Sequence, residues 1–129
     1  MGKAEGRELP FDGVEKVDAR LLETFAYEYP AREGEITITT DEWNCVCPFS
    51  GLPDFGTLTI RYCPDALCLE LKALKYYLTT YRTVGIYQEH AANRILEDLT
   101  AACRPRRIEV QLEYRLRGGI RTVVAVHHP

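Results

Sequence analysis

Two side chains in one short segment have the types and spacing needed for covalent chemistry. The sequence CVCPFSGLPDFG begins at Cys45, and it places Cys47 before a proline and Asp54 seven residues later. A cysteine thiolate adds to polarised carbon when neighbouring groups lower the pKa of the thiol. An aspartate donates a proton when loss of solvent raises the pKa of its carboxyl. Without further pattern, a buried thiol is the favoured explanation of Cys47, and Asp54 is explained as a turn residue.

Two predicted helices follow, and each begins with charged residues. Residues 69–81 carry apolar side chains at i, i+3 and i+4 spacing, and Lys72 and Lys75 lie off that stripe. Glu70 near the start of this helix and Glu89 at the start of the next favour the helix dipole, which needs no ligand. The lysines fit a solvated face equally well. If these residues bind a ligand, that ligand must carry an amidine-like edge, which a glutamate can bind, and a phosphate, which the lysines can bind.

Alternating polar and apolar side chains predict the strands that surround these helices. Residues 21–30 are expected to form a short helix or turn, and residues 47–56 a constrained loop. The Gly118-Gly119 pair is typical of a hairpin turn with positive φ. The predicted elements are strands at 35–43 and 57–62, helices at 69–81 and 89–103, and strands at 107–117 and 120–126. This β-β-α-α-β-β order predicts an α+β fold: an antiparallel sheet with two helices on one face. Long unpaired edges of such a sheet favour an oligomer.

Length and charge narrow the class of protein. The 129 residues fit a single domain, residues 1–129, whose polar residues 1–18 are expected to be a flexible arm. The net charge of -3 gives no basic excess, so direct binding to nucleic acid is not expected. No apolar run approaches the roughly 18–20 residues of a membrane span, and the first residues lack the apolar region of a signal peptide. We therefore expect a cytoplasmic protein without membrane association.

The cysteines indicate reduced thiols rather than disulfides or a metal site. Their number is five, which is odd, and the chain shows no export signal. Cys45 and Cys47 form a C-x-C pair, unlike the C-x-x-C of zinc ribbons, so no metal is predicted. Cys63, Cys68 and Cys103 have apolar neighbours and are expected to be small core residues.

Several segments together resemble one enzyme family. The segment ELKALKYYLTTYR resembles the signature helix of the NADPH-dependent 7-cyano-7-deazaguanine reductases, the nitrile reductases of queuosine biosynthesis. CPFSGLPDF is similar to the active-site loop of that family, and YQEHAANRILEDL to its next helix. LETFAYEYP and the RGGI hairpin match as well, so the resemblance covers the chain from about residue 20 onward. The length suits the short, single-domain form of the family.

The resemblance implies a fold, a reaction and a cofactor. The fold is the tunnelling fold, in which sheets join into rings and two rings stack, here as a decamer, with sites at subunit interfaces. The substrate is a small 7-deazapurine, whose nitrile carbon is attacked by the cysteine that Cys47 matches, giving a covalent thioimide. Asp54 matches the residue that delivers the proton. Hydride from two NADPH molecules then gives the aminomethyl product.

The resemblance also implies binding residues. A carboxylate such as that of Glu89 accepts hydrogen bonds from the ring N1–H and the exocyclic amine together. Gln88 stands where the family has histidine, and a glutamine can still donate to a ring carbonyl. The implied substrate contacts are Leu69, Glu70, Leu71, Gln88 and Glu89, and the implied NADPH phosphate contacts are Lys72, Lys75 and Arg117. No G-x-G-x-x-G follows a predicted strand, so the cofactor site is not of the Rossmann type.

Three other functions compete with the reductase. An amidinotransferase of the same fold would use Cys47 and Asp54 on the nitrile without NADPH, but the intact lysine-bearing helix favours the reductase. A zinc-dependent cyclohydrolase would need histidine ligands, and His90, His127 and His128 lack partner spacing. A non-catalytic, ring-forming binding module would leave Cys47 as a core thiol.

Overall fold

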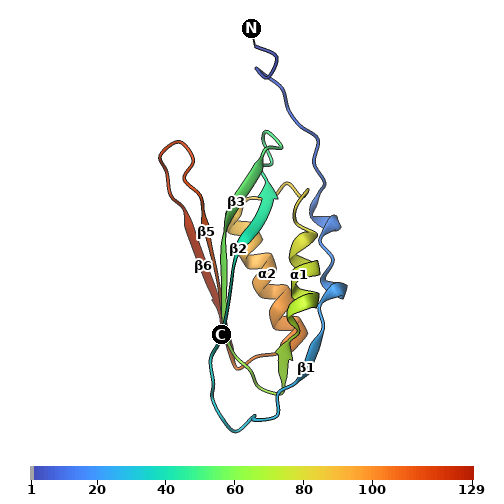
Figure 1. The fold of residues 1–129 in the computed structure, drawn as a ribbon, viewed down its shortest axis with the longest axis vertical. Helices are drawn as coiled ribbons and strands as arrows, with labels where there is room; N and C mark the ends of the chain where they lie inside the picture. Colours follow the sequence, from blue (N-terminus) through green and yellow to red (C-terminus); the bar gives the residue numbers. More distant parts are fainter. Residues whose placement is uncertain (1) are drawn as a thin grey trace.

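The computed structural model describes residues 2–129, and its main feature is a four-stranded antiparallel sheet covered on one face by two helices (Figure 1). The strands follow the order β2-β3-β5-β6 across the sheet. A two-stranded sheet, β1-β4, lies at one end of the molecule. The long strands are β2 (Ile36–Val46), β3 (Pro53–Cys63), β5 (Arg107–Tyr114) and β6 (Val123–His128); the helices are α1 (Leu71–Thr79) and α2 (Gln88–Cys103); the short elements are β1 (Thr24–Ala26), β4 (Leu67–Leu69) and the 3-10 turns η1 (Val14–Lys16) and η2 (Ala19–Leu21).

The core lies between the sheet and the helices because the strands alternate as the sequence predicts. In the central strands β3 and β5, every second side chain is buried and, up to the last residue of β3, the side chains between them are half-buried or exposed. The buried side chains of α1 and α2 pack against this face. The largest fully buried members are Trp43, Tyr62, Tyr77, Tyr81, Leu58, Ile60, Ile95 and Leu99. The predicted β-β-α-α-β-β order and the α+β class are thus confirmed for the long elements.

The strand predicted at residues 107–117 ends at Tyr114, and the strand predicted at 120–126 is β6, which begins at Val123. Two further predictions are wrong because the small β1-β4 sheet was not predicted. Residues 21–30 contain the strand β1 rather than a helix, because Thr24–Ala26 pairs with Leu67–Leu69. The helix predicted at residues 69–81 begins at Leu71, since Leu69 belongs to that small sheet and Glu70 is the N-cap. Short strands carry too little alternation to be recognised before their partner is known.

The loop predicted at residues 47–56 is shorter than expected, which changes the position of Asp54. The β2-β3 ladder continues past a bulge between Thr40 and Trp43 and pairs Cys45 with Asp54. Only residues 47–52 remain outside the strands. Asp54 therefore lies on β3 and faces inward, so its interpretation as a turn residue is wrong.

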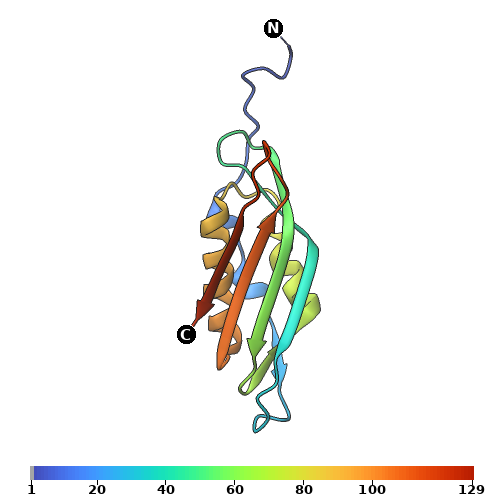
Figure 2. The same cartoon turned by 90° about the vertical axis from the view of Figure 1, so that its left-hand side faces the viewer.

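Both hairpins of the sheet turn at the same end of the molecule (Figure 2). In the β5-β6 hairpin, Gly118 and Gly119 have φ of 58° and 77°, as the sequence predicts. β2 and β6 are the two edges of the sheet, consistent with the expectation that another copy covers them. No helix within residues 2–129 is long and apolar enough to cross a membrane.

Candidate active site

A tight loop holds Cys47 at the end of β2. The Cys47 N–H donates to the Leu52 carbonyl at 2.8 Å, and the Gly51 N–H donates to the Cys47 carbonyl at 2.8 Å. The Ser50 hydroxyl accepts from the Leu52 N–H at 3.2 Å. These bonds close residues 47–52 on themselves and leave Cys47 only partly buried. A half-exposed thiol on a closed loop is accessible to a small substrate.

The surroundings of Cys47 favour its thiolate. Partial burial raises the pKa of the thiol, but the N–H groups of Ser50 and Phe49, the Ser50 hydroxyl and Arg117 lower it. The net pKa lies below the ordinary value of a cysteine, as a nucleophile requires. Cys45, two residues earlier, is fully buried, and burial raises its pKa to about 12. Of the two thiols in the C-x-C pair, only that of Cys47 has a lowered pKa and is accessible.

Asp54 is a buried carboxyl whose one cationic partner within residues 2–129 is Arg117. Its side chain is 4% exposed and accepts a close contact from the Arg117 guanidinium. Burial raises the pKa of Asp54, and Arg117 partly offsets that rise. A carboxyl with a raised pKa is suited to proton donation at neutral pH.

Arg117 reaches this site from the neighbouring hairpin. It follows β5, while Asp54 lies on β3, the strand paired with β5. The sequence comparison above implied a phosphate contact for Arg117, whereas the structure places it against Asp54 and beside Cys47. Cys47, Asp54 and Arg117 thus form one cluster: a nucleophile, an acid and a fixed positive charge.

The residues expected at the start of α1 are arranged around its first turn. The Glu70 carboxylate accepts from the backbone N–H of Lys72 at 3.0 Å and of Ala73 at 2.7 Å. These two bonds lower the pKa of Glu70, so the group is an ionised N-cap. Leu69 is buried and Leu71 is 60% exposed. Of this group, Leu71 and the outer edge of Glu70 remain available to a ligand.

Gln88 and Glu89 lie in the first turn of α2, close to the cysteine loop. Gln88 is half-buried, and Glu89 is exposed with no side-chain partner among the described residues. The ring of Tyr87, the N-cap residue, meets the ring of Phe49 edge-on with centroids 6.2 Å apart. Since Phe49 belongs to the Cys47 loop, the start of α2 and the nucleophile share one region of the surface.

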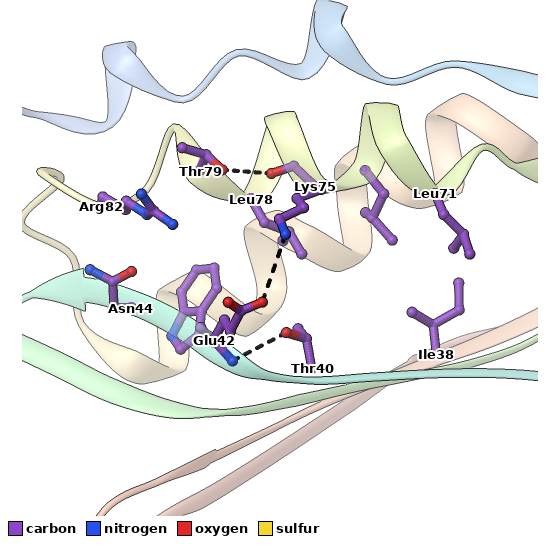
Figure 3. A pocket seen from close by; sticks show the side chains of 11 residues that line it. Ile38, Thr40, Glu42, Asn44, Leu71, Lys75, Leu78, Thr79 and Arg82 are labelled. Carbon is purple, nitrogen blue, oxygen red and sulfur yellow. Dashed lines mark hydrogen bonds and ion pairs between the residues drawn. The ribbon is translucent and has the colours of Figure 1, made fainter.

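Of the two signature lysines, Lys75 lies beside a groove between β2 and α1 (Figure 3). Lys75 lines this groove of about 210 Å³, and its Nζ is 3.9 Å from the Glu42 carboxylate across it. Arg82 and Asn44 stand at one end of the groove, and Leu71 and Ile38 form an apolar wall at the other. Lys72 is exposed on α1 but does not line the groove.

The groove was missed at the sequence level. Its polar residues Glu42, Asn44 and Arg82 come from two segments whose alignment depends on how β2 packs beside α1. The spacing of these residues in the sequence does not show that β2 and α1 lie side by side. Within residues 2–129, no group of three or more His, Cys, Asp or Glu side chains is placed to hold a metal ion.

Comparisons with known proteins show the family of this chain. The sequence profile of the family described as QueF-like protein matches residues 53–129. The chain is 48% identical to the NADPH-dependent 7-cyano-7-deazaguanine reductase of Caldicellulosiruptor bescii, over 98% of this chain and 96% of the relative. It is also 48% identical to the protein of the same name from Caldanaerobacter subterraneus subsp. tengcongensis, over 98% and 94% of the two chains.

A solved structure shares the fold. The crystal structure of the archaeosine synthase QueF-Like in the apo form superposes with a TM-score of 0.68, at 25% sequence identity, over 72% of this chain and 91% of that chain. The fold is therefore the tunnelling fold of that group, as expected from the sequence. The chain belongs to the QueF-like family. Its curated relatives with about half of their residues in common are named NADPH-dependent 7-cyano-7-deazaguanine reductases, which are oxidoreductases.

Proposed function

We propose that this protein reduces the nitrile of 7-cyano-7-deazaguanine to an aminomethyl group with NADPH, a reaction of queuosine biosynthesis. The observation that carries the proposal is the identity of 48% with named reductases over nearly the whole chain. The cluster of Cys47, Asp54 and Arg117 supplies the chemistry that the name requires. The solved archaeosine synthase has the same fold as this chain but is only 25% identical to it. The shared fold therefore does not favour an amidinotransferase over a reductase.

The residues of the cluster act on the nitrile in a fixed order. The Cys47 thiolate forms a bond to the nitrile carbon, and one π bond of the triple bond breaks. The electron pair of that bond takes the proton of Asp54 at nitrogen, which gives a neutral thioimide. Arg117 is retained against the Asp54 carboxylate that remains. NADPH supplies the hydride for each of the two reductions that lead to the amine.

The start of α1 and the start of α2 lie at opposite ends of the helical layer in one chain (Figure 1), so in this proposal the substrate ring binds where the start of α2 in one copy meets the start of α1 in a second copy. We assign the paired hydrogen bonds from the ring N1–H and the amine to Glu89, because its carboxylate has no other partner within residues 2–129. Gln88 beside it donates to the ring carbonyl. Leu71 and the outer edge of Glu70 complete the pocket in this proposal. Glu70 also caps the first turn of α1, and the buried Leu69 supports that turn without facing the ligand.

The groove beside α1 fits a phosphate-bearing cofactor. Lys75 and Arg82 provide positive charge at one part of it, and Leu71 provides an apolar wall. Lys72 extends the charge on the exposed face of α1. A groove of 210 Å³ is smaller than the roughly 300–1,000 Å³ of drug-sized sites, so one chain alone holds only part of NADPH. We infer that a second copy completes the site, as the expected decamer of stacked rings would allow. The same proposal includes a cytoplasmic location and no direct contact with nucleic acid.

Turnover with the natural cofactor tests the proposal. Purified protein is mixed with 7-cyano-7-deazaguanine and NADPH, and cofactor oxidation is followed by absorbance. Two NADPH oxidised per substrate are expected for the wild type, none for Cys47→Ala, and an unchanged ratio for the buried-thiol control Cys68→Ala. A covalent adduct on Cys47 without NADPH oxidation would favour the amidinotransferase. Ligand binding without consumption would favour the binding module.

A further inference from the structure

The segment before the first 3-10 turn crosses the outer side of the Cys47 loop. The Leu9 N–H donates to the Ser50 carbonyl at 2.9 Å. Gly51, with φ of 73°, lies directly under Leu9: a Cβ added there would be 2.3 Å from the Leu9 carbonyl oxygen. The side chains of Phe49 and Leu52 are 74% and 53% exposed, so they do not anchor the loop in the core. Leu9 is therefore a principal tertiary contact of this loop.

The same segment also fixes the strand end that precedes the cysteine. The Asp12 N–H donates to the Thr83 carbonyl at 2.8 Å, and the Gly85 N–H donates to the Asp12 carbonyl at 2.9 Å. Residues 83–86 in turn pair with Val46, whose N–H donates to the Val84 carbonyl at 3.0 Å. Residues 9–12, which we call the strap, thus hold the loop directly at Ser50 and indirectly at Val46.

Residues 2–8, the described residues before the strap, make no comparable contacts. The Glu5 N–H bonds to the Gly2 carbonyl and the Arg7 N–H to the Ala4 carbonyl, both within the segment itself. Both views show this part of the chain leading away from the sheet and helices, with the strap beside the β2-β3 turn (Figures 1 and 2). A substitution in residues 2–8 can therefore serve as a control for a substitution in the strap.

We propose that the strap is a positioning element for the nucleophile: the Leu9–Ser50 hydrogen bond holds the loop so that the Phe49 and Ser50 N–H groups point at the Cys47 sulfur. In the observed arrangement of the loop, these N–H groups lower the pKa of Cys47 and so stabilise its thiolate. The Ser50 carbonyl belongs to the peptide unit next to the one that carries the Ser50 N–H, so fixing one orients the other. The inference rests on the proposed function in taking Cys47 as the nucleophile.

The test measures the thiolate of Cys47 without substrate or NADPH. The rate of alkylation by iodoacetamide is recorded against pH for the full chain, with Cys47→Ala giving the background of the four buried cysteines. Leu9→Pro removes the donor to Ser50. We expect the apparent pKa of Cys47 to rise by about one unit and alkylation at neutral pH to slow about tenfold. Leu9→Ala keeps the N–H and should behave as the wild type, and so should Arg7→Pro.

Each outcome decides the inference. An unchanged pH profile for Leu9→Pro overturns it, including when the melting temperature falls, because that result leaves the strap a purely structural element. An equal shift for Arg7→Pro also overturns it, since proline anywhere in the segment would then have the same effect. Turnover of the wild type with NADPH is measured separately. Failure of turnover with the expected Leu9→Pro shift would therefore reject the proposed reaction and retain the strap.

Discussion

Replacing Arg117 with glutamine tests how the charges of the site depend on one another. The guanidinium is the only cationic partner of Asp54 among the described residues, and it also lowers the pKa of Cys47. Asp54 is 4% exposed, so water cannot take the place of the lost partner. In Arg117→Gln, burial still raises the pKa of Asp54, and no positive charge remains to lower it.

The expected magnitudes follow from these contacts. Loss of a neighbouring arginine raises the pKa of a carboxyl by about 1–3 units, so the pKa of Asp54 should rise further above its already raised value. Because the folded state then holds its proton more tightly than the unfolded state, the free energy of unfolding falls as pH rises from the unfolded pKa through the folded pKa. The fall is about 1.4 kcal/mol for each unit of difference between the two values. The pKa of Cys47 should rise as well.

Two measurements check this reasoning. Chemical unfolding across pH should show a steeper loss of stability above about pH 4 for Arg117→Gln than for the wild type. Alkylation of the variant should require a higher pH. Arg121→Gln is the matched control, because Arg121 lies near the same hairpin but pairs with the exposed Glu113 at 2.6 Å. Equal pH profiles for Arg117→Gln and the wild type, or equal shifts for both variants, would refute the argument.

Two further predictions concern the core and the groove. Tyr77→Phe removes the hydroxyl that bonds Asp98 at 2.6 Å and Tyr81 at 2.7 Å, so chemical denaturation should show a loss of about 1–3 kcal/mol with turnover per folded protein unchanged. A loss below about 0.5 kcal/mol would contradict the importance of that buried network. Lys75→Gln should raise KM for NADPH about tenfold with little change in kcat, and Glu42→Gln, which frees Lys75, should lower it. Equal KM values for both variants and the wild type would place the cofactor phosphates elsewhere.

The elements of this fold could be predicted where one sequence period continues for long enough. Alternation in β3 and β5 and the helical stripes of α1 and α2 appear in the sequence as they do in the structure. The strand β1 was not predicted, because three residues show no period and its partner β4 lies about forty residues away. Elements that depend on a distant partner cannot be read from local sequence.

The same distinction applies to the site. Cys47 and Asp54 could be proposed from the sequence because they lie in one short segment that resembles the active-site loop of the family. Their pairing with Arg117 could not, since it joins residues 63 positions apart through the β3-β5 register. The strap was expected to be only a polar lead-in, because backbone hydrogen bonds such as that from Leu9 to Ser50 leave no mark in side-chain patterns. Ion pairs between distant residues and backbone hydrogen bonds between loops can be identified only in the structure.

The covalent step at Cys47 is the central claim, and mass spectrometry tests it most directly. The protein is incubated with 7-cyano-7-deazaguanine in the absence of NADPH, and the intact mass and its peptides are measured. We expect the mass of the whole substrate to be added to the peptide that contains Cys47, with no addition to Cys47→Ala and loss of the adduct when NADPH is supplied. Turnover by the wild type together with the absence of any adduct, or turnover by Cys47→Ala, would contradict a thiolate nucleophile.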